Sequence, residues 1–185
     1  MSLPSDHRTR IKICGLTREA DVIDAVQAGA DAIGFVLYEK SPRYVSAQRA
    51  KELAALLPPF VTPVLLFVNA SASLLQAARE AVPHAVWQFH GDELPSDCDQ
   101  AQRPYFRAAR MAPGFNLLDF ACSHPNAQAI LVDAHVEGYG GGGQVFDWSL
   151  LPQGLSRPMF LSGGLHPGNV MDGVKQVRPW AVDVS

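Results

Sequence analysis

The sequence predicts an α/β fold, specifically a (β/α)8 TIM barrel that lacks its C-terminal eighth helix. Eight short apolar runs rich in β-branched residues recur along the 185 residues, and helical stretches separate them. Alternating strands and helices of this kind are typical of a parallel sheet. Eight strands favour a closed barrel over an open doubly wound sheet. No G-x-G-x-x-G follows the first run, so the usual signature of a dinucleotide-binding fold is missing.

The predicted strands are the apolar runs themselves. Several are almost continuously apolar, such as AIGFVL and AILVDA, as expected of strands buried on both faces of a parallel sheet. The expected strands are Arg10–Leu16, Ala32–Leu37, Pro63–Val68, Ala85–His90, Tyr105–Arg110, Ala129–Asp133, Met159–Ser162 and Ala181–Val184.

Residues that typically begin or end helices lie between these strands. Thr17 can cap a helix that Gly29 closes, and Ser46 can cap a second helix that runs through Leu57 until Pro58 stops it. We expect Ser71 or Ser73 to open the third helix.

Two segments depart from a complete barrel. Residues 91–103 are polar and weakly periodic, so their helix should be short. The chain stops at Ser185, directly after the eighth strand. We therefore expect a flexible extension over residues 1–10 and one barrel domain over residues 11–185 that is incomplete at its C-terminus. Apolar surface on the first and eighth strands should then be open to water.

Composition excludes several classes of protein. With 48% hydrophobic and 18% charged residues the chain can bury a core, which excludes a disordered protein. A net charge of −3 provides no field for nucleic acid or an anionic membrane, and no apolar run is long enough to cross a bilayer. Three cysteines without a C-x-x-C spacing argue against a disulfide framework and favour a reduced, cytoplasmic compartment.

Candidate catalytic residues lie where predicted strands end, because barrel enzymes place their sites at that rim. Alternation puts Lys12 and Cys14 on one face of the first strand. Cys14 is either a small buried core thiol or, because Gly15 and Thr17 follow at once, a thiol at the rim. Asp133 ends the sixth strand, where a carboxylate either caps the loop or acts on a ligand.

Glycines follow two of these strands. The run GYGGGG at 138–143 lies between two barrel strands, so we interpret it as a ligand-wrapping loop in which Gly141 and Gly142 contact substrate. Ser162, Gly163 and Gly164 end the seventh strand, where backbone N–H groups can approach a phosphate closely.

Two further rim residues are candidates for binding. Arg43 is either a solvated loop charge or a bidentate partner for a substrate carboxylate. His90 is either packed at the rim or in contact with substrate. The histidines show no metal-ligand spacing, so we expect no metal.

Taken together, the motifs IKICGLT, KSPRYVS, GYGGGGQVFDW and SGGLHPGNV resemble the phosphoribosylanthranilate isomerase family of tryptophan biosynthesis. The resemblance runs in the family's order from Ile11 to Ser185 and covers essentially the whole chain.

The resemblance implies an Amadori rearrangement of N-(5-phosphoribosyl)anthranilate to 1-(2-carboxyphenylamino)-1-deoxyribulose 5-phosphate. It implies that Cys14 is the general base, that Asp133 is the general acid and that Arg43 holds the anthranilate carboxylate. The loop over residues 162–164 and the segment from Asp183 to Ser185 would surround the sugar phosphate. No redox cofactor or metal is needed, because the substrate nitrogen is the electron sink. Cys14 must be helped towards a thiolate, and Lys12 is the candidate helper.

Other functions remain open at this point. Another phosphosugar barrel enzyme would use paired acids with metal-binding histidines, or a lysine with glutamates at strand ends, and neither set is seen. A catalytically inactive module that binds phosphate ligands is the alternative from another class. The sequence leaves a monomer and a homodimer equally open.

Overall fold

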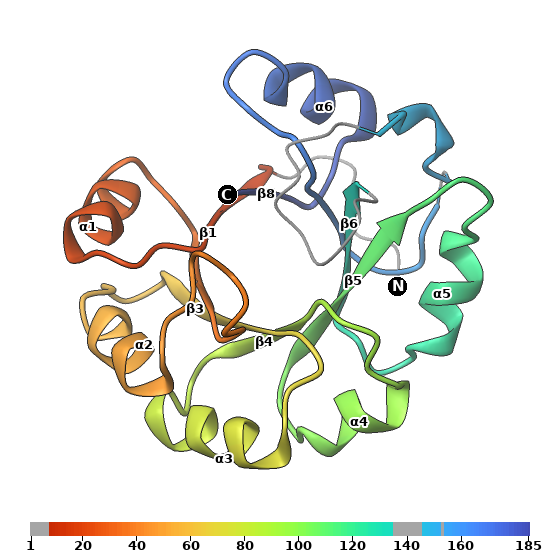
Figure 1. Cartoon of the computed structure of the whole chain (residues 1–185). Coiled ribbons are helices and arrows are strands. Elements are labelled where there is room, and N and C mark those ends of the chain that lie inside the picture. The colour runs from red at the N-terminus through yellow and green to blue at the C-terminus, as the bar shows by residue number, and fades with distance from the viewer. Residues whose placement is uncertain (1–7, 135–145, 153) are drawn as a thin grey trace.

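The structure, a computed structural model, describes residues 8–134, 146–152 and 154–185. Its described strands form one closed parallel barrel in the order β1-β2-β3-β4-β5-β6-β7-β8, with helices around the outside (Figure 1). The predicted TIM barrel is confirmed.

The strands begin and end close to the predicted positions. They are β1 (Arg10–Cys14), β2 (Ala32–Val36), β3 (Thr62–Phe67), β4 (Val86–Phe89), β5 (Tyr105–Met111), β6 (Ala129–Ala134), β7 (Met159–Leu161) and β8 (Ala181–Val184). Closure pairs β1 with β8, and this pairing sets Lys12 beside Asp183.

The described residues form six α-helices and one short 3₁₀ helix. These are α1 (Glu19–Gln27), α2 (Ala47–Ala54), α3 (Ala72–Ala81), α4 (Pro95–Gln100), α5 (Leu117–Ser123), α6 (Val170–Val177) and the 3₁₀ helix η1 (Trp148–Leu150). The segment after β4 carries the six-residue α4, which confirms the short helix expected there.

Helix caps were predicted correctly in two of three places. The Ser46 hydroxyl accepts from the Arg49 N–H, and the Ser71 hydroxyl accepts from the Leu74 N–H, so Ser71 and not Ser73 is the third cap. The cap assigned to Thr17 is wrong: α1 starts one residue later, after Arg18, and has no side-chain cap.

The end predicted for the second helix is also wrong. Helix α2 ends at Ala54, before the prolines, and the chain continues in turns through Leu57.

The core has two parts separated by the sheet. Outward side chains pack beneath the helices, and inward ones fill the barrel as expected for alternating strands. Val64, Phe106 and Leu131 form an apolar layer inside the barrel. Above it, towards the carboxyl ends of the strands, buried polar side chains such as Lys12, Asp133 and Asp183 lie in the same interior as a second apolar cluster of Cys14, Val36, Leu66 and Val68. The barrel wall itself therefore positions the candidate site.

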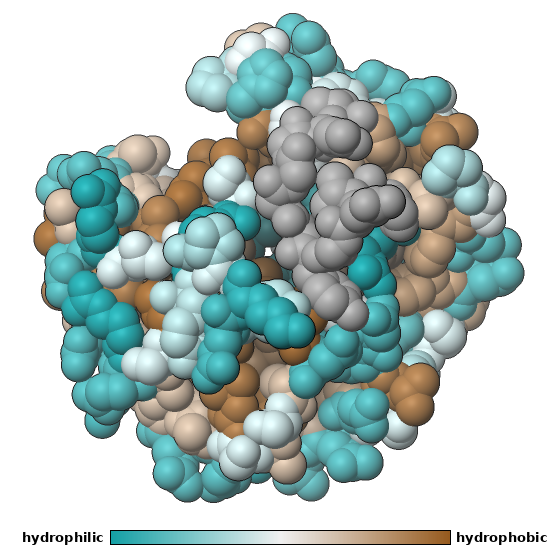
Figure 2. Space-filling model, in the orientation of Figure 1, coloured by the Kyte–Doolittle hydropathy of each residue, from teal (hydrophilic) through white to brown (hydrophobic). Residues whose placement is uncertain are grey.

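The outer face of β1 is less covered than that of β2. Ile33 on β2 is fully buried, whereas its register partner Ile13 on β1 is only partly buried. Figure 2 shows the surface hollowed between α1 and α6, with hydrophobic atoms at its floor. The partial exposure expected on the first strand is thus present among the described residues.

The expected N-terminal extension is described only in part. Residues 1–7 lie outside the described residues. Arg10 already belongs to β1, and the Arg8 guanidinium donates to the Asp31 carboxylate.

Candidate active site

The polar interior of the barrel collects side chains from four strands. Alternation turns one set of side chains inward near the carboxyl ends, and it contains several buried polar groups. These are Lys12 and Cys14 on β1, Gln88 with His90 at the end of β4, Asp133 on β6 and Asp183 on β8. Buried polar groups are rare unless they are paired, so a cluster at this rim is a candidate active site.

Cys14 lies next to an ion pair. The Lys12 ammonium donates to Asp183 Oδ1 at 2.7 Å, and Lys12 Nζ and Cys14 Sγ both lie close to the position that a Cβ on Gly34 would take. Both members of the ion pair are almost completely buried. The predicted shared face of Lys12 and Cys14 is therefore confirmed.

The proton on Cys14 is held more tightly than on an ordinary thiol. Burial raises the pKa of Cys14; Lys12 lowers it, Asp183 raises it and Arg43 lowers it by smaller amounts. Lys12 thus acts in the expected direction, but its charge is shared with Asp183. Burial alone would lower the pKa of Lys12, yet Asp183 and Cys14 together raise it, so Lys12 stays an ammonium.

Asp133 ends β6 within reach of a histidine. His90 Nε2 lies 3.1 Å from Asp133 Oδ2, although their angle is not that of a hydrogen bond. The Gln88 amide lies 3.1 Å from His90 Nδ1. When this amide donates, Nδ1 is the acceptor and the imidazole proton sits on Nε2, the nitrogen nearer to Asp133.

The loop after β7 approaches Asp133 closely. A Cβ on Gly163 would lie 2.5 Å from the Ala134 nitrogen and 2.8 Å from Asp133 Oδ1. Gly163 and Gly164 both have positive φ, 81° and 63°. Only glycine meets both demands at position 163 without strain. The Asn169 amide donates to the Gly164 carbonyl at 2.9 Å and fixes the turn.

Arg43 reaches back to the end of β1. Its guanidinium donates to the Cys14 carbonyl at 3.3 Å. A Cβ on Gly15 would lie 2.6 Å from Arg43 Cδ, so this glycine provides the space for the arginine. The structure thus brings Arg43 to the same strand end as the thiol.

A buried ion pair outside the barrel was not predicted from the sequence. The Arg107 guanidinium donates to the Phe89 and Gly91 carbonyls, and it pairs with Glu93 at 3.4 Å. These contacts hold the loop that carries His90. An arginine inside an apolar strand is the signal in the sequence that could have indicated this role.

The remaining candidates differ in how the structure places them. Gly141 and Gly142 lie outside the described residues. Ser162, the residue that follows β7 in the chain, is partly buried, whereas Ser185 is exposed. The Asp183 side chain points to Lys12 inside the barrel.

Among the described residues no group of three or more histidine, cysteine or acidic side chains could hold a metal ion. No helix in this part of the chain is long and apolar enough to cross a membrane. All three cysteines are free.

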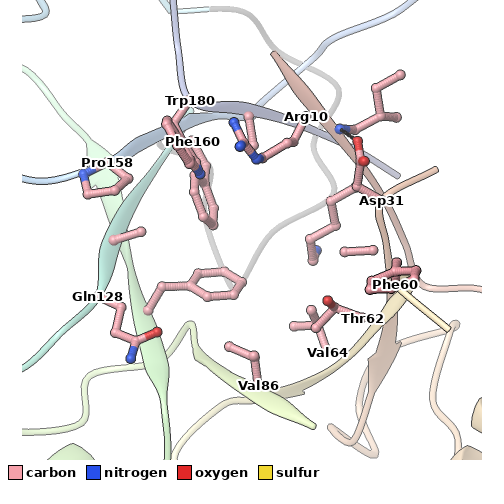
Figure 3. A pocket seen from close by; sticks show the side chains of 16 residues that line it. Arg10, Asp31, Phe60, Thr62, Val64, Val86, Gln128, Pro158, Phe160 and Trp180 are labelled. Atoms are coloured by element: carbon pink, nitrogen blue, oxygen red, sulfur yellow. Dashed lines mark hydrogen bonds between the residues drawn. The ribbon is translucent and has the colours of Figure 1, made fainter. Parts of the chain in front are cut away.

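A cavity of about 410 Å³ opens at the other end of the barrel. Figure 3 shows Val64, Val86 and Phe160 pointing into it. Arg10 stacks 3.6 Å above the Trp180 ring at its edge. Because barrel enzymes react at the opposite rim, we assign the chemistry to the carboxyl ends and not to this cavity.

Known proteins resemble this chain over almost its whole length. Residues 11–185 match the sequence profile of the family described as N-(5'phosphoribosyl)anthranilate (PRA) isomerase. An N-(5'-phosphoribosyl)anthranilate isomerase of Leptothrix cholodnii is 66% identical over 181 residues, which cover 98% of this chain and 82% of that protein.

Solved structures share the fold. The phosphoribosyl anthranilate isomerase of Thermus thermophilus superposes with a TM-score of 0.83 at 30% identity, covering 95% of this chain and 86% of the other. Another such enzyme, 34% identical with a TM-score of 0.79, was solved with reduced 1-(o-carboxyphenylamino)-1-deoxyribulose 5-phosphate; the match covers 96% of this chain and 87% of that one. The chain therefore belongs to the N-(5'-phosphoribosyl)anthranilate isomerase family.

Proposed function

We propose that Asp133 and Cys14 are the acid and the base with which this isomerase of tryptophan biosynthesis rearranges N-(5'-phosphoribosyl)anthranilate. The observation that carries the proposal is their placement. Both side chains belong to the polar upper interior of one barrel, on strands β6 and β1 that β7 and β8 separate. A sugar lying across the mouth has one of them on each side.

Ring opening is the first step. Asp133 gives its proton to the furanose oxygen, the bond from that oxygen to C1′ breaks, and the anthranilate nitrogen supplies electrons to form the Schiff base. His90 Nε2 lies 3.1 Å from the carboxylate that this step leaves behind. In this scheme His90 stabilises the Asp133 carboxylate after its proton has left.

Proton removal from C2′ is the second step. The Cys14 thiolate takes the C2′ proton, a C1′=C2′ double bond forms, and the electrons move to the nitrogen. The resulting enolamine tautomerises to the ketone. All protons moved in this scheme are exchanged with these two side chains or with water.

Substrate recognition belongs to the loops around the mouth. Arg43 binds the anthranilate carboxylate, since its guanidinium lies at the end of β1 and donates to the Cys14 backbone carbonyl. The backbone of Ser162, Gly163 and Gly164 binds the sugar phosphate, with Gly141, Gly142 and Ser185 as further expected contacts. The sequence resemblance predicts Asp183 beside the phosphate, but its buried carboxylate pairs with Lys12 and fits the acid–base centre better.

The experiment is to add phosphoribosylanthranilate to the purified chain and to follow the loss of its fluorescence. Steady turnover supports the proposal. Binding of the reduced product analogue without turnover would instead support the inactive phosphate-ligand module. The Asp21→Asn variant is a control for both measurements, because Asp21 on α1 pairs with the exposed Arg18 that precedes this helix.

Two coarser features belong to the same proposal. We place the enzyme in the cytoplasm, where three free cysteines persist. Monomer and homodimer remain the two expected states, and sedimentation at several concentrations decides between them. The expectation that it binds no nucleic acid stays a prediction.

A further inference from the structure

Three ionisable side chains meet inside the barrel with one positive charge among them. Lys12 donates to Asp183 across the β1–β8 pair at 2.7 Å, and Cys14 lies two residues further along its own strand on the same inward face. All three residues are at most 6% exposed. Bulk water therefore cannot compensate the charge of any one of them.

Strand β2 leaves space for this cluster. Gly34 pairs with Cys14 in the sheet, and a Cβ on Gly34 would lie 2.7 Å from Cys14 Sγ and 3.1 Å from Lys12 Nζ. The Cys14 thiol and the Lys12 ammonium thus both lie against the space that a side chain at position 34 would occupy. The close contact depends on this glycine.

Two acidic groups compete for the single ammonium. Burial raises the pKa of both Cys14 and Asp183 above their ordinary values, and Lys12 opposes this shift in each. Arg43 also lowers the pKa of Cys14, and at Asp183 the charge of Asp133 acts upward and that of His90 downward. One buried cation neutralises one anion, so the low-energy states hold either a carboxylate with a thiol or a carboxylic acid with a thiolate.

We propose that Asp183 accepts the proton that Cys14 loses, through Lys12, so that the thiolate forms only when this carboxylate is neutralised. The Lys12 ammonium gives one N–H proton to Asp183 Oδ1 and takes the thiol proton on the same nitrogen. One S–H bond breaks, one carboxylic O–H bond forms, and Lys12 is an ammonium before and after. The net charge of the cluster does not change.

This inference rests on the proposed role of Cys14 as the base, and it makes Asp183 a positioning residue that acts through Lys12. It also explains how a thiol with a raised pKa can serve as a base. The thiolate need not be the resting state of Cys14, because the Asp183 carboxylate can accept the thiol proton through Lys12.

The test is the pH dependence of Cys14 alkylation by iodoacetamide, quantified on the Cys14 peptide so that the exposed Cys122 does not interfere. Asp183→Asn leaves the ammonium with the thiol alone. The alkylation midpoint is expected to fall by about one pH unit or more, because an opposite charge stabilises a buried anion. Lys12→Met removes the cation, and its midpoint is expected to rise by a similar amount.

In Asp183→Asn, Cys14 is expected to be alkylated at lower pH, whereas turnover is expected to become slower. A thiolate held permanently by Lys12 is a weaker base, so kcat falls while KM stays near its original value. A merely structural role for Asp183 would lower kcat without moving the alkylation midpoint downward. Asp21→Asn, with its carboxylate on the surface of α1, is expected to change neither quantity.

A folded Asp183→Asn variant with an unchanged or higher midpoint overturns the inference. If that variant does not fold, Lys12→Met combined with Asp183→Asn leaves no unpaired charge, and its midpoint is expected above that of the original chain. A midpoint equal to the original overturns the inference in that case. Alkylation needs no turnover, so an active Cys14→Ser variant would refute Cys14 as the base without affecting the alkylation result.

Discussion

At the residue scale, the account depends on what burial does to single ionisable groups. Alternation along β1 was enough to put Lys12 and Cys14 on one face from the sequence alone. The partner of Lys12 was not predictable in this way, because Asp183 lies 171 positions further along and meets it only when β8 closes the barrel. The competition between two buried acids for one ammonium is thus a property of the closed fold.

The role of Arg43 gives a prediction at this scale. Arg43→Ala should raise KM and leave kcat nearly unchanged, since the guanidinium is proposed to hold a carboxylate that does not react. Loss of a charged hydrogen bond costs about 1.5–3 kcal/mol, or roughly tenfold or more in affinity. Steady-state kinetics measure this change.

Arg18→Ala is the matched control, because Arg18 is an exposed arginine whose side chain pairs with Asp21. An Arg43→Ala enzyme with the KM of this control would make Arg43 an ordinary loop charge.

At the scale of helices and strands, the sequence predicted the features that depend on residues close together in the chain. Ser46 and Ser71 cap their helices as expected, since an N-cap hydroxyl needs only the backbone three residues ahead. Thr17 and the end of α2 were predicted wrongly, because tertiary packing fixes where the chain leaves each strand and helix. The turn at Gly163 shows the same limit. The sequence predicts a glycine turn after β7, but its closeness to Asp133 depends on how β7 lies against β6.

That turn gives the second prediction. Gly163→Ala should lower kcat by about tenfold or more, because the new methyl group displaces the acid and small displacements of catalytic groups are costly. Turnover and thermal unfolding are measured together.

Gly114→Ala separates displacement of the acid from backbone strain. Gly114 has a φ of 80°, close to the 81° of Gly163, but nothing lies within 4 Å of the position that its new methyl group would take. The control should lose stability and keep kcat. Equal kcat losses in both variants would refute the contact with Asp133 as the cause.

At the scale of the whole molecule, the ring of helices does not cover the barrel evenly. The eight strands were predictable because a parallel barrel wall is buried on both faces and its sequence is correspondingly apolar. The hollow between α1 and α6 leaves the outer face of β1 partly open, although its residues are as apolar as those of β2 (Figure 2).

The unequal cover predicts unequal stability effects at two neighbouring isoleucines. Ile33→Ala on β2 should cost about 2–5 kcal/mol of unfolding free energy, the usual range for a fully buried side chain. Ile13→Ala should cost clearly less, since Ile13 is its partner in register and points to the same outer face but is only partly buried. Urea unfolding of both variants measures the difference, and equal losses would show that β1 is as well covered as β2.

The most direct test of acid–base catalysis by Asp133 and Cys14 measures turnover and binding in the same two variants. For Cys14→Ser and Asp133→Asn, kcat is followed by substrate fluorescence, and the Kd of the reduced product analogue is followed by titration. Each kcat should fall by about 10²–10⁴-fold, the usual contribution of a general acid or base, while each Kd changes by less than about threefold. A folded variant of either residue that keeps its kcat within about tenfold of the original would contradict the mechanism.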